Sequence, residues 1–150
     1  METRRGNFSI STDKSRLDRG LIHDYLSRSS YWARSIPRDI VDRSIEHSLC
    51  FGIYDRDAQV GFARVISDHA TFAYVCDVFV LESQRGHGLG VWLMEVIRAH
   101  PDLQGLRKWV LTTRDAHGLY RKSGFREIEE PVRYMEILDR QIYERQQSKT

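Results

Sequence analysis

The segment Gln84–Gly90, with the sequence QRGHGLG, is the part of the chain best suited to bind a ligand. Three glycines within five residues allow a tight bend and a close approach to the backbone. The segment follows an apolar run and precedes residues with helical spacing, so unpaired N–H groups at a helix start would lie beside Arg85. Such an arrangement favours a phosphate group. From spacing alone, a turn that binds nothing is the alternative.

Two known phosphate-binding loops do not fit this segment. The dinucleotide pattern G-x-G-x-x-G would need a glycine at position 91, which is Val91. The Walker pattern needs Gly-Lys-Ser/Thr, which does not occur here. The glycine segment therefore predicts a phosphate loop of another kind.

Asp77 lies in the middle of the apolar run 72–81, FAYVCDVFVL, where a carboxylate is disfavoured and needs compensation. One interpretation is a general base that acts directly or through water. The other is a structural carboxylate that bonds a strand distortion or pairs with an arginine such as Arg64. The sequence leaves both open.

Hydrophobic periodicity predicts a mixed α/β fold that would position these residues. Helices are expected at 18–29, 37–47, 89–99 and 116–123. Strands are expected at 7–11, 49–54, 60–67, 72–81, 108–112, 125–128 and 132–138. The three strands within 49–81 predict an antiparallel meander, and the next helix predicts a strand–helix–strand crossover.

Length and composition predict one domain over residues 1–150, of the ordinary soluble globular kind, with 41% hydrophobic and 29% charged residues. A net charge of +2 argues against a nucleic-acid binder recognised by bulk charge. No apolar stretch is long enough for a membrane span, and the first twenty residues do not form a signal peptide, so a cytoplasmic location is expected. Cys50 and Cys76 are expected to be reduced core thiols, and no spacing predicts a metal site.

Two motifs lie on either side of the expected strand 108–112: Arg85-x-x-Gly88-x-Gly90 before it and Ala116-x-x-x-Tyr120-x-x-x-Gly124-Phe125 after it. With them the chain resembles the GCN5-related N-acetyltransferase (GNAT) family. The first motif is similar to the loop that holds the pyrophosphate of acyl-CoA in that family, and the second is similar to the family's second signature. The resemblance covers roughly residues 49–135. It implies a central mixed, mostly antiparallel sheet with a splayed strand pair, flanked by about four helices. Thr113 departs from the asparagine that many members have at this position.

The resemblance also implies site residues. The strand would hold the pantetheine arm of CoA and the loop its pyrophosphate, so the implied cofactor-binding residues are Val78, Phe79, Val80, Arg85, Gly86, His87, Gly88, Leu89, Gly90 and Tyr120. Tyr120 would lie near the sulfur and protonate the leaving thiolate, and Asp77 is the candidate base. Without the resemblance, Tyr120 is equally typical of a core tyrosine with its hydroxyl at the rim.

The implied reaction moves the acetyl group of acetyl-CoA to a primary amine, by direct attack in a ternary complex. A catalytically silent acyl-CoA-binding sensor or regulatory module is the alternative. A small-molecule amine is the expected acceptor, and a homodimer is common among the proteins that the chain resembles.

The acceptor side is expected in the segment 29–34. Tyr31 and Trp32 would form either a wall over the acceptor or an anchor for the segment. Arg34 would either pair with a substrate carboxylate or phosphate or be an ordinary surface arginine. His117, one helical turn before Tyr120, would line the same cleft or lie on the helix surface. The tail 139–149 is expected to be a solvated end.

Overall fold

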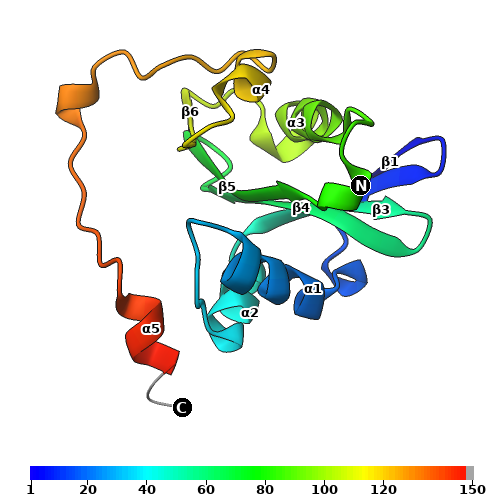
Figure 1. Ribbon diagram of the computed structural model, residues 1–150. Coiled ribbons are helices and arrows are strands. Elements are labelled where there is room, and N and C mark those ends of the chain that lie inside the picture. Colours follow the sequence, from blue (N-terminus) through cyan, green and yellow to red (C-terminus); the bar gives the residue numbers. More distant parts are fainter. Residues whose placement is uncertain (148–150) are drawn as a thin grey trace.

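The predicted meander forms the centre of the sheet in this computed structural model, which describes residues 1–147 (Figure 1). Its strands are β3 (Leu49–Asp55), β4 (Ala58–Ser67) and β5 (Phe72–Val80), paired antiparallel in chain order. The turn into β5 is fastened by the Asp68 carboxylate, which accepts the N–H groups of Ala70, Thr71 and Phe72. The prediction of a meander is confirmed.

Two further strands extend the sheet beyond β3. β2 (Phe8–Ser11) pairs antiparallel with β3 as expected. β1 (Glu2–Arg5) forms a hairpin with β2 through a turn in which Gly6 has a φ of +62°. β1 was not predicted, because its sequence ETRR has neither alternation nor apolar residues.

At the other end of the sheet, β6 (Lys108–Val110) lies parallel to β5, which completes the strand order β1-β2-β3-β4-β5-β6. The two strands pair only from Phe72↔Lys108 to Tyr74↔Val110, although β5 continues to Val80. β5 therefore extends six residues past the end of this ladder. This is the splayed strand pair expected from the resemblance.

Helices cover both faces of the sheet (Figure 1). One face carries α1 (Arg19–Asp24), which continues as a π-helical turn (Tyr25–Ser29), and α2 (Arg38–Glu46). The other face carries α3 (Leu89–Ala99) and α4 (His117–Arg121), and α5 (Ile142–Gln147) follows near the end of the described residues. Short 3₁₀ turns occur at Lys14–Arg16, Glu82–Gln84, Pro101–Leu103 and Pro131–Arg133.

The side chains of the sheet divide into two hydrophobic clusters. Phe51, Ile53 and Val65 point to the α3 face, where Trp92, Leu93 and Ile97 are buried against them. Cys50 and Phe62 belong to the other cluster, between the sheet and the helices α1 and α2. Because every second residue of a strand faces the same way, the apolar runs of the meander supply both clusters.

The predicted strands 125–128 and 132–138 are wrong, because neither segment forms a strand in the described residues. Neither segment joins the sheet, and 132–138 lies in an exposed arm that begins at the 3₁₀ turn Pro131–Arg133. A strand needs a partner ladder for its backbone groups, which a sequence pattern does not provide. The tail expected to be solvated contains α5, whose Tyr143 packs on the α1–α2 cluster; positions 148 and 149 lie outside the described residues.

We predict that Leu93→Ala lowers the free energy of unfolding by about 3 kcal/mol, since the side chain is fully buried and its removal leaves a cavity. Urea denaturation followed by circular dichroism measures this change. Glu95→Ala is the matched control on the same helix, because its 59% exposed side chain makes a long ion pair of 3.6 Å with Arg5. Equal losses in the two variants would contradict the described core.

Candidate active site

The glycine segment forms the turn from β5 into α3, and its backbone donors are unoccupied. Gly86 and Gly88 have φ values of +91° and +71°, a left-handed conformation that glycine adopts without a Cβ penalty. Within residues 1–147, no protein acceptor takes the amide hydrogens of Gly86 through Val91. Exposed amides at the positive end of an 11-residue helix can donate hydrogen bonds to an anion.

Arg85 is held beside these amides. Its Nε donates to the Val80 carbonyl at 3.3 Å, and its guanidinium also lies 3.4 Å from the Tyr25 hydroxyl. The Tyr25 ring stacks on Phe79 with centroids 4.0 Å apart. One positive charge is therefore placed at the end of β5, next to the helix start. His87 is exposed and lies against the Phe8 ring, at 5.6 Å between centroids.

A β-bulge at Asp77 changes the direction in which β5 presents its side chains. Phe62 of β4 lies opposite Phe79, but Arg64 lies opposite Cys76, so β5 has one extra residue. Before the bulge Val75 packs on the α3 face, and after it Val78 does, at a spacing of three instead of two. Asp77 has a φ of +53°, a conformation that aspartate tolerates better than most residues.

Asp77 is paired, as the second interpretation of the sequence required. Its Oδ2 accepts the Arg64 Nε–H at 2.9 Å, and its Oδ1 accepts the Trp32 indole N–H at 2.8 Å. Arg64 also donates to Ser48 Oγ at 3.0 Å. The Asp77 side chain is only 9% exposed and that of Arg64 17%, so the ion pair is largely shielded from water. The carboxylate is thus held in position from two sides.

Tyr31 and Trp32 connect the segment after α1 to other parts of the chain. Their rings meet edge to face at 5.0 Å, and they are 42% and 41% exposed. The Tyr31 hydroxyl accepts the Arg114 backbone N–H at 2.9 Å, and the Arg114 guanidinium lies 3.9 Å from the Tyr31 ring centroid. The segment after α1 thereby reaches the chain that leads from β6 to α4. Both rings are therefore anchored, as one of the two sequence interpretations expected, and each is still partly exposed.

Tyr120 lines a cavity of about 330 Å³ between the strand side 109–113 and the segment 125–128. Burial, followed by the charges of Tyr31 and Asp115, raises the pKa of Tyr120 to about 12. In the described residues no protein group bonds to its hydroxyl. The phenol is therefore protonated at neutral pH and has a donor to offer. Thr113 accepts the Ala116 N–H and so fastens the start of α4.

Three of the predicted residues lie at the edge of this arrangement. Arg34 is exposed and has no partner among residues 1–147. His117 is exposed but lines the Tyr120 cavity. Gly90 lies in the first turn of α3, where a Cβ would meet Leu119 at an ordinary 3.5 Å.

Sequence reasoning missed the residues that act through long-range contacts: Tyr25, Ser48, Arg114 and Tyr143. Burial, followed by the negative charge of Asp77, raises the pKa of Tyr143, which places this α5 residue toward the Arg64–Asp77 pair. None of these four has a local pattern that marks it. Arg64 alone was named in advance, as an arginine that could pair with Asp77.

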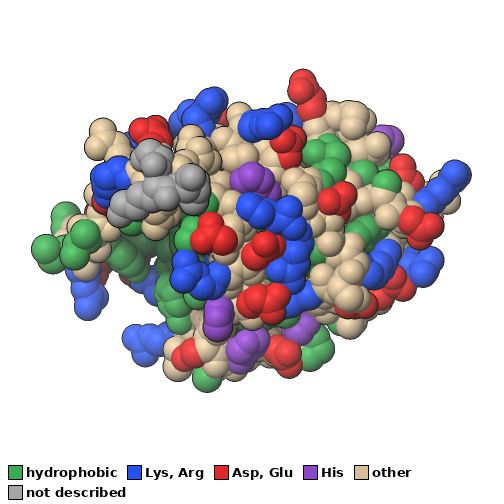
Figure 2. All heavy atoms as spheres, turned by 90° about the horizontal axis from the view of Figure 1, so that it is seen from below, with side chains coloured by type: hydrophobic (Ala, Val, Ile, Leu, Met, Phe, Trp, Pro, Cys, Tyr) green, Lys and Arg blue, Asp and Glu red, His purple; other side chains and the backbone are tan. Residues whose placement is uncertain are grey.

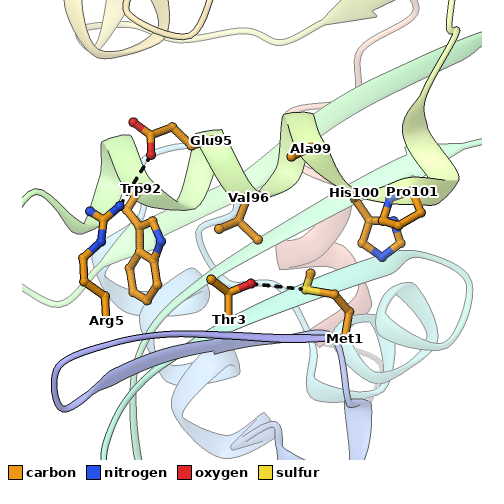
Figure 3. Close-up of a pocket in the computed structure, with 9 residues that line it drawn as sticks. All are labelled: Met1, Thr3, Arg5, Trp92, Glu95, Val96, Ala99, His100 and Pro101. Carbon is orange, nitrogen blue, oxygen red and sulfur yellow. Dashed lines mark hydrogen bonds and ion pairs between the residues drawn. The ribbon is translucent and has the colours of Figure 1, made fainter.

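A second cavity, of about 360 Å³, lies between β1 and α3, away from these residues (Figure 3). Its polar groups are already occupied by neighbours. Arg5 bonds Glu95 and lies over the Trp92 ring at 4.8 Å. His100 accepts the Asp102 N–H through Nδ1, and its pKa is lowered by burial. The cavity therefore offers no free chemical group comparable to Tyr120 or the glycine amides.

The cysteines are unsuited to covalent catalysis. Burial raises the pKa of Cys50 to about 11 and that of Cys76 to about 12, so both thiols are protonated at neutral pH. Among residues 1–147 no group of three or more His, Cys, Asp or Glu side chains is placed to hold a metal ion. None of the helices described is both long and apolar enough to cross a bilayer.

Known proteins are similar to this chain in sequence and in fold. The family model "Acetyltransferase (GNAT) domain" matches residues 46–127. A protein of Gibberella zeae, FG08082, named provisionally as an acetyltransferase, is 31% identical over 141 residues, 79% of this chain and 78% of that protein.

Solved structures agree with this match. A crystal structure from Xanthomonas campestris pv. campestris, described provisionally as an acetyltransferase of the GNAT family, is 53% identical with a TM-score of 0.88, over 91% of this chain and 96% of that one. AAC(6')-Iy, solved with the bisubstrate analog CoA-S-monomethyl-acetylneamine, has a TM-score of 0.63 over 87% and 99% of the two chains. Its 19% identity shows the shared fold alone.

We predict that Asp77→Asn lowers the free energy of unfolding by about 3 kcal/mol, because it leaves the Arg64 charge without its partner. Asparagine still accepts the Trp32 N–H and tolerates the left-handed backbone, so the variant isolates the charge. Urea denaturation measures the loss.

Two controls accompany this variant. Asp24→Asn removes an exposed pair with Arg28, 63% and 80% exposed, and should leave the free energy of unfolding nearly unchanged. Arg64→Met/Asp77→Asn removes both charges and should be less destabilised than Asp77→Asn alone. If the double variant lost more free energy of unfolding than Asp77→Asn, the unpaired Arg64 charge would not be the cause of the loss in the single variant.

Proposed function

The chain belongs to the GNAT acetyltransferase family, and we propose that it transfers the acetyl group of acetyl-CoA to a primary amine by direct attack in a ternary complex. The observation that carries this proposal is the row of unoccupied amides from Gly86 to Val91, next to Arg85 at the end of β5. Tyr120 offers a free phenol on the α4 side of the same splayed strand pair. Asp77 lies on the opposite face, beside the exposed aromatic rings.

The proposed CoA site uses backbone groups more than side chains. Arg85 and the amides of Gly86, His87, Gly88, Leu89 and Gly90 would bind the pyrophosphate. Past Tyr74, β5 has no ladder with β6, so the backbone of Val78, Phe79 and Val80 can pair with the amides of the pantetheine arm. An N–H near Phe79 would polarise the thioester carbonyl. The likeness to a fold solved with a CoA-linked analog supports this placement.

On the amine side, we propose that Asp77 takes the proton of the attacking ammonium, directly or through water. An alkylammonium has a pKa near ~10, so a base must remove its proton before it attacks. A carboxylate can accept more hydrogen bonds than the two from Arg64 and Trp32. The exposed faces of Tyr31 and Trp32 suit a cationic amine. Arg34, exposed beside them, would pair with a carboxylate or phosphate of the acceptor.

Tyr120 would stabilise the leaving thiolate. A simple thiol has a pKa of roughly 8.5, well below the value of about 12 for this phenol, so full proton transfer to the thiolate is uphill. Donation of a hydrogen bond to the developing negative charge carries no such cost. As the amide forms, its nitrogen releases a second proton to solvent, and the thiolate takes a proton from solvent after it leaves. The protonated Cys50 and Cys76 support direct attack over a cysteine acyl-enzyme.

We predict that Arg85→Ala weakens acetyl-CoA binding by about 10- to 100-fold, because one charged hydrogen-bond donor to the pyrophosphate is lost. Isothermal titration calorimetry measures the affinity, and the difference should shrink at high salt. Arg28→Ala is the control, since that side chain is 80% exposed and its ion-pair partner is the exposed Asp24. Equal affinities of Arg85→Ala and Arg28→Ala for acetyl-CoA would show that Arg85 does not bind the cofactor.

A thiol-release screen over small amines, amino acids and peptides tests the reaction itself. With an accepted amine, Tyr120→Phe should lower kcat by about 100-fold and leave the Kd of acetyl-CoA unchanged. The wild-type rate should rise with pH as the amine loses its proton. The rate should show no decline up to pH ~10, because the Tyr120 phenol, with a pKa of about 12, is still protonated at that pH.

Two outcomes would count against the proposal. If acetyl-CoA binds but no amine supports release of CoA, the chain is a silent acyl-CoA-binding sensor. If Tyr120→Phe turns over as fast as the wild type, the phenol has no part in the chemistry. Tyr74→Phe is the matched control, because the Tyr74 hydroxyl already lies 3.4 Å from Thr112 Oγ1.

A further inference from the structure

The helix α5 docks on the segment that carries the exposed aromatic rings. Gln147 donates through Nε2 to the Ser35 carbonyl at 2.6 Å. Tyr143 is partly buried and packs on the α1–α2 cluster, which includes Ala33. In Figure 1 α5 lies beside the stretch of chain that leads from α1 to α2. The expected acceptor segment 29–34 therefore has a neighbour from a distant part of the sequence.

Tyr143 also lies toward the buried ion pair that joins β4 and β5. Burial, followed by the negative charge of Asp77, raises the pKa of the Tyr143 phenol, while the positive charge of Arg64 acts against this rise. Trp32 bonds the same Asp77 carboxylate through its indole N–H at 2.8 Å. Tyr143 and Trp32 thus approach one carboxylate from two different elements.

The contacts of α5 are few enough for its docking to be reversible. A helix of six residues is not stable by itself in water. Ile142 is 39% exposed, so the helix buries little apolar surface there. Gln146 Oε1 is buried without a hydrogen-bond partner among residues 1–147, and an unpaired buried acceptor weakens the docked state. An element with these properties can open to admit a ligand and close again.

The chain that leads to α5 does not hold it against the body. Val132, Met135 and Ile137 are 93%, 97% and 105% exposed, so the middle of the arm 132–138 packs on nothing in the described residues. Figure 1 shows the arm running outside the body from α4 to α5. The position of α5 is therefore set by its own contacts, those of Tyr143 and Gln147.

The face that carries α1 and α2 does not have a patch of one charge. Figure 2 views this face and shows basic and acidic side chains interspersed on it. Arg19 pairs with Asp42 and Glu46, and Arg38 pairs with Asp42. A charged protein segment would bind best to a patch of the opposite sign. The face therefore favours an acceptor small enough to bind without docking on it.

We propose that the ring of Tyr143 forms one wall of the acceptor side, and that α5 limits the acceptor to a small aliphatic amine. The N-terminus or a lysine of a protein would have to displace α5. Tyr143 would join Tyr31 and Trp32, so that three aromatic rings lie near the amine beside Asp77. Aromatic rings attract an ammonium group through their faces. The role of Tyr143 rests on the proposed function, since it concerns the acceptor of the same reaction.

The test measures CoA release by Tyr143→Ala with two acceptors: the best small amine of the screen and the pentapeptide AGKGA, which has a free N-terminus and a lysine. The wild type should prefer the small amine by at least about 100-fold in kcat/KM. Tyr143→Ala should raise the KM of the amine by about 10-fold, because one aromatic contact is lost, and keep kcat within about twofold. Its preference for the amine over the pentapeptide should fall by about 10-fold, and its Kd for acetyl-CoA should not change.

Two variants serve as controls. Tyr143→Phe keeps the ring and should keep the KM of the amine within about threefold. Ile142→Ala is the matched control on the same helix, because its side chain is exposed and lies outside the α1–α2 cluster. It should keep the KM and the preference of the wild type. A loss of stability alone would leave the preference between the two acceptors unchanged, so the preference identifies a contact with the acceptor.

The outcomes separate this role of Tyr143 from the reaction itself. If Tyr143→Ala kept the KM and the preference of the wild type, the proposal would be overturned and acetyl transfer would stand. A wild type that used the pentapeptide as well as the small amine would overturn it too, and so would a Tyr143→Phe variant as impaired as Tyr143→Ala. If no acceptor of the screen released CoA, the proposed function would be rejected, and the role of Tyr143 with it.

Discussion

The ion pair between Arg64 and Asp77 is the interaction on which the shape of β5 and the position of the Trp32 ring both depend. It joins β4 to β5 at 2.9 Å in a largely buried position, where a lone charge would be costly. The same aspartate is the extra residue of the bulge, with a φ of +53°. A left-handed residue costs about 1–2 kcal/mol, which the ion pair and the Trp32 hydrogen bond can offset. The ion pair therefore stabilises the unusual backbone conformation of the bulge.

The bulge has a consequence for every residue that follows it on β5. It shifts the side-chain alternation by one, so Phe79 packs against Tyr25 under α1 while Val78 faces α3. Past Tyr74 the strand also leaves its ladder with β6. The end of β5 is thus free of a parallel neighbour, and it delivers the chain to the turn at Gly86 and Gly88. An unoccupied backbone edge and unoccupied helix amides follow one another within a few residues.

The sequence was sufficient wherever the determinant was local. The apolar runs of β3 to β5, the spacing in α3 and the glycines that need a positive φ could all be read from neighbouring residues. It was not sufficient for the contacts of Trp32 with Asp77 and Tyr31 with Arg114, which join residues 45 and 83 positions apart. It also failed at 125–128 and 132–138, since the composition of a strand does not say whether a partner ladder is present for it.

The two edges of the sheet differ in a way that explains where this failure falls. β1, at one edge, has the sequence ETRR, and charged residues of this kind discourage pairing with another chain. β6, at the other edge, continues from Lys108 into Trp109, Val110 and Leu111, with no comparable protection. An unprotected edge beside an exposed apolar arm is a liability for an isolated chain.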